Sequence, residues 1–225
     1  MRKFIISIFN VLILVTFSFN IACAQNINLL PKYGSMPKNE AQLGADKAFF
    51  AAIDKHYKSD RKKAAEDVAM RGWQFLRRGN SDDAMRRFNQ AWLLDNRNGS
   101  ALWGMAAVQG NTGKMKESLQ LFSEAERFIS NDIDFMVDHA RAIGFTSVAT
   151  KNEVLLKDAF GRYEQLYKRA PQHVLNLQNW AIVLYSTGNY AEAWKKIKLA
   201  EAAPRANELD KKFIAELQKK MPRPL

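Results

Sequence analysis

The chain has 225 residues, which is enough for one domain or a short repeat array. Apolar residues make up 47% of it, so the composition excludes a globally disordered protein. Thirty-four basic and 23 acidic residues give a formal charge of +11, and the single cysteine excludes an internal disulfide.

Residues 1–24 have the order of an export signal. Arg2 and Lys3 precede an apolar run over residues 4–19, and Ala22 and Ala24 then form an Ala-x-Ala cleavage junction. We predict a signal peptide over 1–24 and an exported, periplasmic protein of bacterial type. Its removal deletes two basic residues and no acidic one, so the charge falls from +11 to +9. The other interpretation is an uncleaved membrane anchor, although the run is shorter than the ~20 residues of a membrane span.

The only cysteine, Cys23, lies inside this junction. The sequence Ile-Ala-Cys resembles the end of a bacterial lipobox, although Asn20 stands where an aliphatic residue is expected. The alternative to a free periplasmic protein is therefore an outer-membrane lipoprotein anchored through Cys23. A basic exported protein is not expected to bind nucleic acid. Its charge favours anionic lipid head groups or an acidic protein face, or is simply a solvated surface.

The segment between the signal peptide and the first repeat has two parts. Residues 25–38 contain Pro31, Gly34 and Pro37, and we predict a flexible segment there. Residues 39–58 predict an amphipathic helix. Its apolar residues are Leu43, Phe49, Phe50, Ile53 and Tyr57. Two roles are open for this helix, as a cap on the repeats or as a partner-binding helix.

Residues 59–207 contain a repeat with a period of 34, in units near 65–98, 99–132, 133–173 and 174–207. Each unit places a small residue in its first helix. These are Gly72, Ala106, Ala140 and Ala181. A second small residue and a large one follow in the second helix. These are Ala84 with Phe88, Ser118 with Phe122, Ala159 with Tyr163, and Ala193 with Ile197. Small residues let the two helices approach, and the large ones fill the gap one turn later.

Glycines separate the two helices in three of the units, at Gly79, Gly113 and Gly188. Each is predicted to end a helix in the left-handed conformation. The third unit has no such glycine and carries seven extra residues. We predict that its turn runs over 145–150 and that Thr150 and Glu153 form a capping box. The extra residues are either a longer turn or a loop that borders a binding face.

This pattern resembles the tetratricopeptide repeat (TPR), a helix–turn–helix unit of 34 residues. The matching positions are Val68, Gly72, Phe75, Ala84, Phe88 and Ala91 in the first unit, Leu102, Ala106, Gly113, Phe122 and Ala125 in the second, and Leu177, Ala181, Leu184, Gly188, Ala193 and Ala200 in the fourth. The resemblance implies an all-α fold, a right-handed α-solenoid of about four TPR units with N- and C-terminal capping helices. Residues 208–221, with Leu209, Phe213 and Leu217 on one stripe, are the predicted C-terminal cap, followed by a loose tail over 222–225.

The resemblance also implies a non-catalytic scaffold or adaptor whose first helices line a concave groove. No HExxH, CxxC, GxSxG or phosphate-loop motif is present, and we expect no catalytic residue, metal site or cofactor. We expect the groove to bind a peptide or helix of another envelope or secreted protein. Helical spacing selects as partner-binding residues Trp73, Arg77, Trp103, Asn111, Arg141, Phe145, Gln178, Asn179 and Tyr185. In the alternative interpretation, Trp73 and Trp103 pack between neighbouring units. His139, beside Ala140, is expected to line the core or the groove.

Overall fold

The computed structural model describes residues 26–224, and that part of the chain contains helices and no strands. The ten α-helices are α1 (Glu40–Tyr57), α2 (Arg61–Arg77), α3 (Ser81–Leu94), α4 (Gly99–Asn111), α5 (Met115–Ile129), α6 (Ile133–Thr150), α7 (Glu153–Arg169), α8 (Val174–Ser186), α9 (Tyr190–Glu201) and α10 (Lys211–Lys220). Three short 3-10 helices are η1 (Ile27–Leu29), η2 (Pro31–Ser35) and η3 (Ala206–Glu208).

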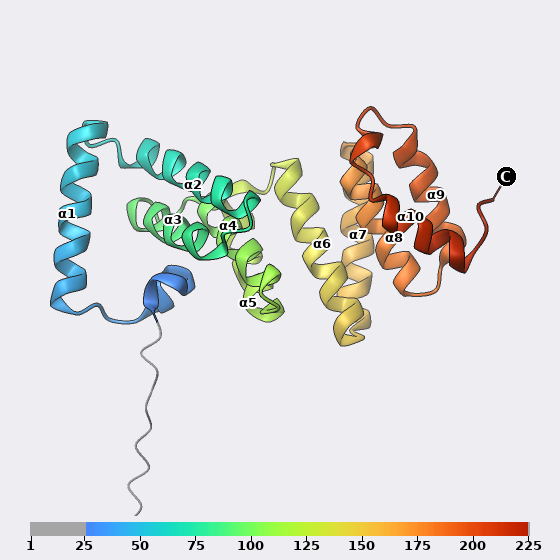
Figure 1. Ribbon diagram of the computed structural model, residues 1–225, viewed down its shortest axis with the longest axis horizontal. Coiled ribbons are helices and arrows are strands. Elements are labelled where there is room, and N and C mark those ends of the chain that lie inside the picture. Colours follow the sequence, from blue (N-terminus) through green and yellow to red (C-terminus); the bar gives the residue numbers. More distant parts are fainter. Residues whose placement is uncertain (1–25, 225) are drawn as a thin grey trace, which may run out of the picture.

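Helices α2 to α9 form four consecutive antiparallel pairs that stack along the long axis of the molecule (Figure 1). Helix α1 lies at one end of the stack and α10 at the other. The predicted all-α solenoid of four helix–turn–helix units with terminal helices is confirmed. The predicted signal peptide over 1–24 and Cys23 lie outside the described residues.

The turns within three of the pairs follow the glycine pattern. Gly79, Gly113 and Gly188 have φ angles of 76°, 79° and 83°, in the left-handed region that a side chain would strain. The side chain of Asn80 then caps α3 by accepting a hydrogen bond from the backbone N–H of Asp83. A glycine stop followed by a side-chain cap explains why α2 ends and α3 begins where they do.

The core of the first two units is built around one phenylalanine ring. Phe88 is fully buried in a notch between Gly72 of α2 and Gly104 of α4. A Cβ atom on Gly72 would lie 2.6 Å from the ring, and one on Gly104 only 2.2 Å from it. The small and large positions of the other units are buried in the same way, and in the second unit the Ser118 hydroxyl donates to the Ala106 carbonyl at 2.8 Å. Close approach of small residues therefore holds each pair together.

The third unit differs from the predicted geometry. Helix α6 continues through Thr150 and α7 begins at Glu153, so the predicted turn over 145–150 is wrong. The seven extra residues lengthen the helices to 18 and 17 residues, against 13 and 15 in α4 and α5. No glycine or proline interrupts 145–150, and the Thr150 hydroxyl bonds back to the Thr146 carbonyl inside the helix. Asn152, rather than Thr150, caps α7, and no loop is available to border a binding face.

Both ends of the array are covered. Helix α1 packs on the first unit through the half-buried residues Phe49, Phe50, Ile53 and Tyr57. Helix α10 buries Leu217, and the Trp194 indole of α9 donates to the Met221 carbonyl at 3.0 Å. We expected residues 25–38 to be flexible, but residues 27–35 form η1 and η2, with Ile27 and Tyr33 buried. The tertiary contacts that order this segment are described below.

Candidate functional site

Trp73 and Trp103 pack between neighbouring units, and both are partly buried. Their ring centroids are 4.6 Å apart at an interplanar angle of 62°. The Trp73 indole donates to the Ser100 hydroxyl and the Trp103 indole to an Asp138 carboxylate oxygen, both at 3.0 Å. These contacts join α2, α4 and α6, so the structure supports the interpretation in which both tryptophans pack between neighbouring units.

The predicted residues of the fourth unit are occupied by the C-terminal segment or buried. The Gln178 side-chain oxygen accepts a hydrogen bond from the backbone N–H of Asp210 at 2.6 Å. The Tyr185 ring packs against Tyr190 of α9 and Phe213 of α10, at centroid distances of 5.4 and 5.7 Å. Asn179 is buried in α8. The chain's own C-terminal segment therefore contacts the face of α8 that helical spacing selects.

Asn111, Arg141 and Phe145 come together. They line a pocket of about 290 Å³ between α4, α5 and α6. The space exists because the wall of α4 is made of Ala106, Ala107 and Gly110, which carry little or no side chain. Two exposed apolar residues, Met115 of α5 and Phe145 of α6, lie at this pocket. Arg77, the last residue of α2, is not among the residues that line it.

A charged pair lies beside the pocket. The Arg141 guanidinium is 3.3 Å from an Asp138 carboxylate oxygen. Burial raises the pKa of Asp138, against the lowering effect of Arg141 and of the Trp103 hydrogen bond. A guanidinium carries five N–H donors, so this single ion pair leaves donors of Arg141 for an anionic group in the pocket. The pocket therefore combines an apolar wall with one cationic edge.

Sequence reasoning missed part of this pocket. It considered only the first helix of each unit, whereas Met115 comes from the start of the second helix α5. Ala142 and Thr146, on a neighbouring face of α6, also line it. One feature of the sequence could have indicated it. Met115 is apolar at the first turn of α5, a position where a solvent-exposed residue is normally polar.

His139 is a core residue with charged neighbours. Together with Glu126, Asp158 and Arg162 it forms a group that we call the His139 cluster. Its ring stacks on Phe122 of α5, with centroids 5.1 Å apart. Its Nδ1 atom lies 3.4 Å from Arg162 and 3.7 Å from Glu126, which is itself paired with Arg162 at 2.7 Å, and Asp158 pairs with Arg162 at 3.2 Å. Burial, and then the Arg162 charge, lower the pKa of His139 to about 4. The cluster links α5, α6 and α7, so His139 belongs to the core, one of the two expected places.

Residues 26–224 also lack two features of other functional classes. No group of three or more His, Cys, Asp or Glu side chains in this range has the arrangement of a metal site. No helix in the same range is long and apolar enough to span a membrane.

Comparisons with known proteins identify the fold. No protein-family model and no curated protein matches the chain. Solved structures do match, among them TTC0263, a thermophilic TPR protein of Thermus thermophilus, with a TM-score of 0.63 and 18% identity over 71% of this chain and 84% of that one. The chain has the tetratricopeptide-repeat fold. At this identity the likeness is evidence of the shared TPR architecture alone.

Two further solved structures have a similar arrangement of helices. The Cut9–Hcn1 hetero-tetramer of the APC/C gives a TM-score of 0.57 at 15% identity, covering 79% of this chain and 32% of that one. MamA 41-end from Desulfovibrio magneticus RS-1 gives 0.50 at 15% identity, covering 72% of this chain and 93% of that one. The TPR array of the present chain thus resembles most of one solved chain and a segment of a longer one.

Proposed function

We propose that this TPR protein is a non-catalytic interaction scaffold of the bacterial cell envelope that binds a peptide or helix of a partner protein. The observation that carries the proposal is the pocket where Asn111, Arg141 and Phe145 meet. The TPR fold supports it, because stacked helix pairs present an extended surface suited to protein binding. The other predicted positions are mostly used for packing, which leaves this pocket as the place for an anchor residue.

The pocket favours a particular ligand chemistry. Its apolar lining, with Phe145 and Met115, suits one large aliphatic or aromatic side chain of the partner. The Arg141 guanidinium at its edge suits a carboxylate on a neighbouring residue of the same peptide. The net charge of +9 expected after signal removal would attract an acidic partner from a distance.

The test is site-specific photocrosslinking in cells with a photoreactive residue in place of Phe145. The matched control carries the same residue at Val154, which is 78% exposed on α7 and does not line the pocket. We expect one dominant crosslinked partner from position 145 and none from 154. Ala107→Leu, which fills the pocket, should abolish the product, as should Arg141→Glu. A product that persists in both variants, in chains whose helicity is unchanged, contradicts the proposal.

The proposal places the protein outside the cytoplasm on the strength of the signal peptide predicted over 1–24. Cell fractionation with mass spectrometry tests this part. We expect a periplasmic chain that begins at Gln25. The lipid-anchored alternative, an outer-membrane assembly factor, requires palmitate labelling that is lost in Cys23→Ser. A full-length chain in the cytoplasm contradicts both forms of the proposal.

A further inference from the structure

The N-terminal segment, residues 26–36, lies across the second helices of the first two units. We call it the strap. Asn89, in the middle of α3, is fully buried, and its side-chain amide donates to the carbonyls of Asn28 and Leu30 at 2.9 and 2.8 Å. Both amide hydrogens are therefore used on two carbonyls that are two residues apart. The amide therefore ties the backbone of a segment outside the helix pairs to the middle of α3.

Side chains of the strap add anchors on both sides of this amide. Ile27 and Tyr33 are 9% and 7% exposed. The Lys32 ammonium pairs with Glu124 of α5 at 2.7 Å. Asn89 belongs to the first unit and Glu124 to the second, so the strap bridges two units. Burial raises the pKa of the Tyr33 hydroxyl above its usual range, as expected for a side chain held out of water.

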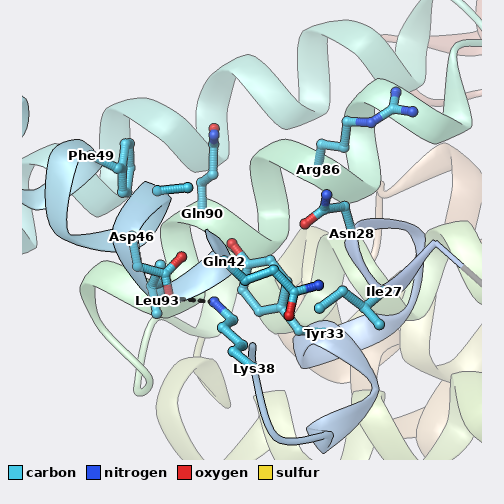
Figure 2. Close-up of a pocket in the computed structure, with 11 residues that line it drawn as sticks. Ile27, Asn28, Tyr33, Lys38, Gln42, Asp46, Phe49, Arg86, Gln90 and Leu93 are labelled. Carbon is cyan, nitrogen blue, oxygen red and sulfur yellow. Dashed lines mark hydrogen bonds and ion pairs between the residues drawn. The ribbon is translucent and has the colours of Figure 1, made fainter. Parts of the chain in front are cut away.

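The loop after the strap contributes one further contact. The Lys38 ammonium lies 3.6 Å from the centroid of the Tyr33 ring and 2.5 Å from an Asp46 carboxylate oxygen of α1. Figure 2 shows these residues around a pocket of about 260 Å³ between the strap, α1 and α3. The strap is thus fixed by α3, α5 and a cation that stacks on its tyrosine.

The conformation of the strap is imposed by this surface. Lys32, Tyr33 and Ser35 have φ angles of 52°, 56° and 54°, in the left-handed region that is unfavourable for a residue with a side chain. Two short 3-10 helices supply little internal hydrogen bonding to offset that cost. The offset comes from Asn89, Glu124 and the buried side chains. The face of α3 and α5 is therefore the element that selects the conformation.

We propose that this face, centred on Asn89 and Glu124, is a second peptide-binding site, and that the strap is its resident ligand. The ligand class is a short peptide that can adopt this turned conformation. It has an apolar residue followed five and six residues later by lysine and an aromatic residue, as in Ile27, Lys32 and Tyr33. A partner segment of this chemistry competes with the strap. Because the strap is tethered, its effective concentration is about millimolar, so a free peptide binds measurably only when the strap is weakened.

The experiment uses the full mature chain and a fluorescent peptide that spans residues 26–38. The weakened chain carries Lys32→Ala and Tyr33→Ala, which remove two anchors of the strap, place no carboxylate opposite position 124 and leave the docking face intact. By fluorescence anisotropy we expect the weakened chain to bind the peptide at least about tenfold more tightly than the wild type does, since the wild-type site is already filled.

Charge reversal supplies the specificity control. Glu124 is partly exposed, with its side chain 32% accessible, so Glu124→Lys should leave the fold unchanged. In the weakened chain this substitution should abolish binding of the wild-type peptide and restore binding of a peptide that carries Lys32→Glu. Circular dichroism checks that the array stays folded, and Lys32→Ala alone serves as the weakened chain if the double variant unfolds. The proposal is overturned if the weakened chain does not bind the peptide. It is also overturned if the affinity for the two peptides does not depend on the charge at position 124.

Discussion

Gly104→Ala is expected to destabilise the protein, because the new methyl group has no room. The Cβ atom would lie 2.2 Å from the Phe88 ring, more than roughly 1 Å inside the ordinary 3.5–4.0 Å contact between carbon atoms. The ring cannot retreat, since Gly72 approaches it from α2. Overpacking of this kind costs about 1–3 kcal/mol, and we take the upper end because the ring is held on both sides. Alanine's higher helix propensity returns about 1 kcal/mol, which leaves a net loss of about 2 kcal/mol.

The matched control is Gly161→Ala in α7, where no atom lies within 4 Å of the new Cβ position. This variant gains propensity without a clash and should be more stable by up to about 1 kcal/mol. Urea unfolding followed by circular dichroism should show a midpoint lowered by about 1 M for Gly104→Ala and slightly raised for Gly161→Ala. Phe88→Leu in the Gly104→Ala background should recover part of the loss. A Gly104→Ala chain as stable as the wild type would refute the packing argument.

Two further predictions concern the core and the C-terminal cap. The pKa of His139 is lowered to about 4, so the unfolded chain takes up the proton first as pH falls below the ordinary value of 6.5. The contribution of neutral His139 to the free energy of unfolding is therefore complete above about pH 6.5 and falls by up to about 3 kcal/mol as pH falls toward 4. Urea midpoints measured across this window should fall with pH. In the His139→Phe variant that dependence on pH should be weaker. Gln178→Ala removes the acceptor for the Asp210 N–H. It should lower the free energy of local opening of α10 by about 1 kcal/mol and leave the other helices unchanged. Hydrogen exchange over 211–220 should quicken about fivefold while that of α2 and α3 stays unchanged, and an equal change in both regions would contradict the local assignment.

The repeat was predictable because its determinants are close in sequence. Gly72 and Phe88 lie in one helix pair, and their alternation of small and large residues recurs in every unit. The second neighbour of Phe88, Gly104, was not predicted, because it comes from the next pair and has no recurring counterpart in the pattern. The fold of each unit is thus encoded locally, whereas the contacts between units depend on how the units stack.

The candidate site was predictable only in part for the same reason. Helical spacing places Trp73, Trp103, Arg141 and Tyr185 on the groove-facing side of the first helices, but it does not tell which of them a neighbour covers. The Trp103 indole donates its hydrogen bond to Asp138, and the Tyr185 ring packs against Phe213 of the C-terminal cap. Arg141 stays at an open pocket because α4 offers small residues opposite it.

The sequence of the strap has no hydrophobic periodicity that would predict its structure. Its order depends on Asn89, whose partners Asn28 and Leu30 are about 60 residues away in the sequence. A lone asparagine inside an amphipathic helix normally indicates a solvent-facing position, and proline and glycine normally indicate a loop. Only the tertiary fold shows that the asparagine is buried and that the loop residues are its ligands. The flexible segment expected over 25–38 was inferred from local rules that a distant partner overrides.

The strap site and the pocket share α5 but not its side chains. Helix α5 is held independently of the strap, through the Ser118 bond to α4 and the Glu126 ion pair with Arg162 of α7. Loss of the Lys32–Glu124 pair therefore removes one contact from a helix that is fixed elsewhere. Reversal of the charge at Glu124 then perturbs the strap without moving the Met115 edge of the pocket. For this reason, failure of the strap experiment would leave the pocket as the candidate scaffold surface, and a pocket that binds nothing would leave the strap site untouched.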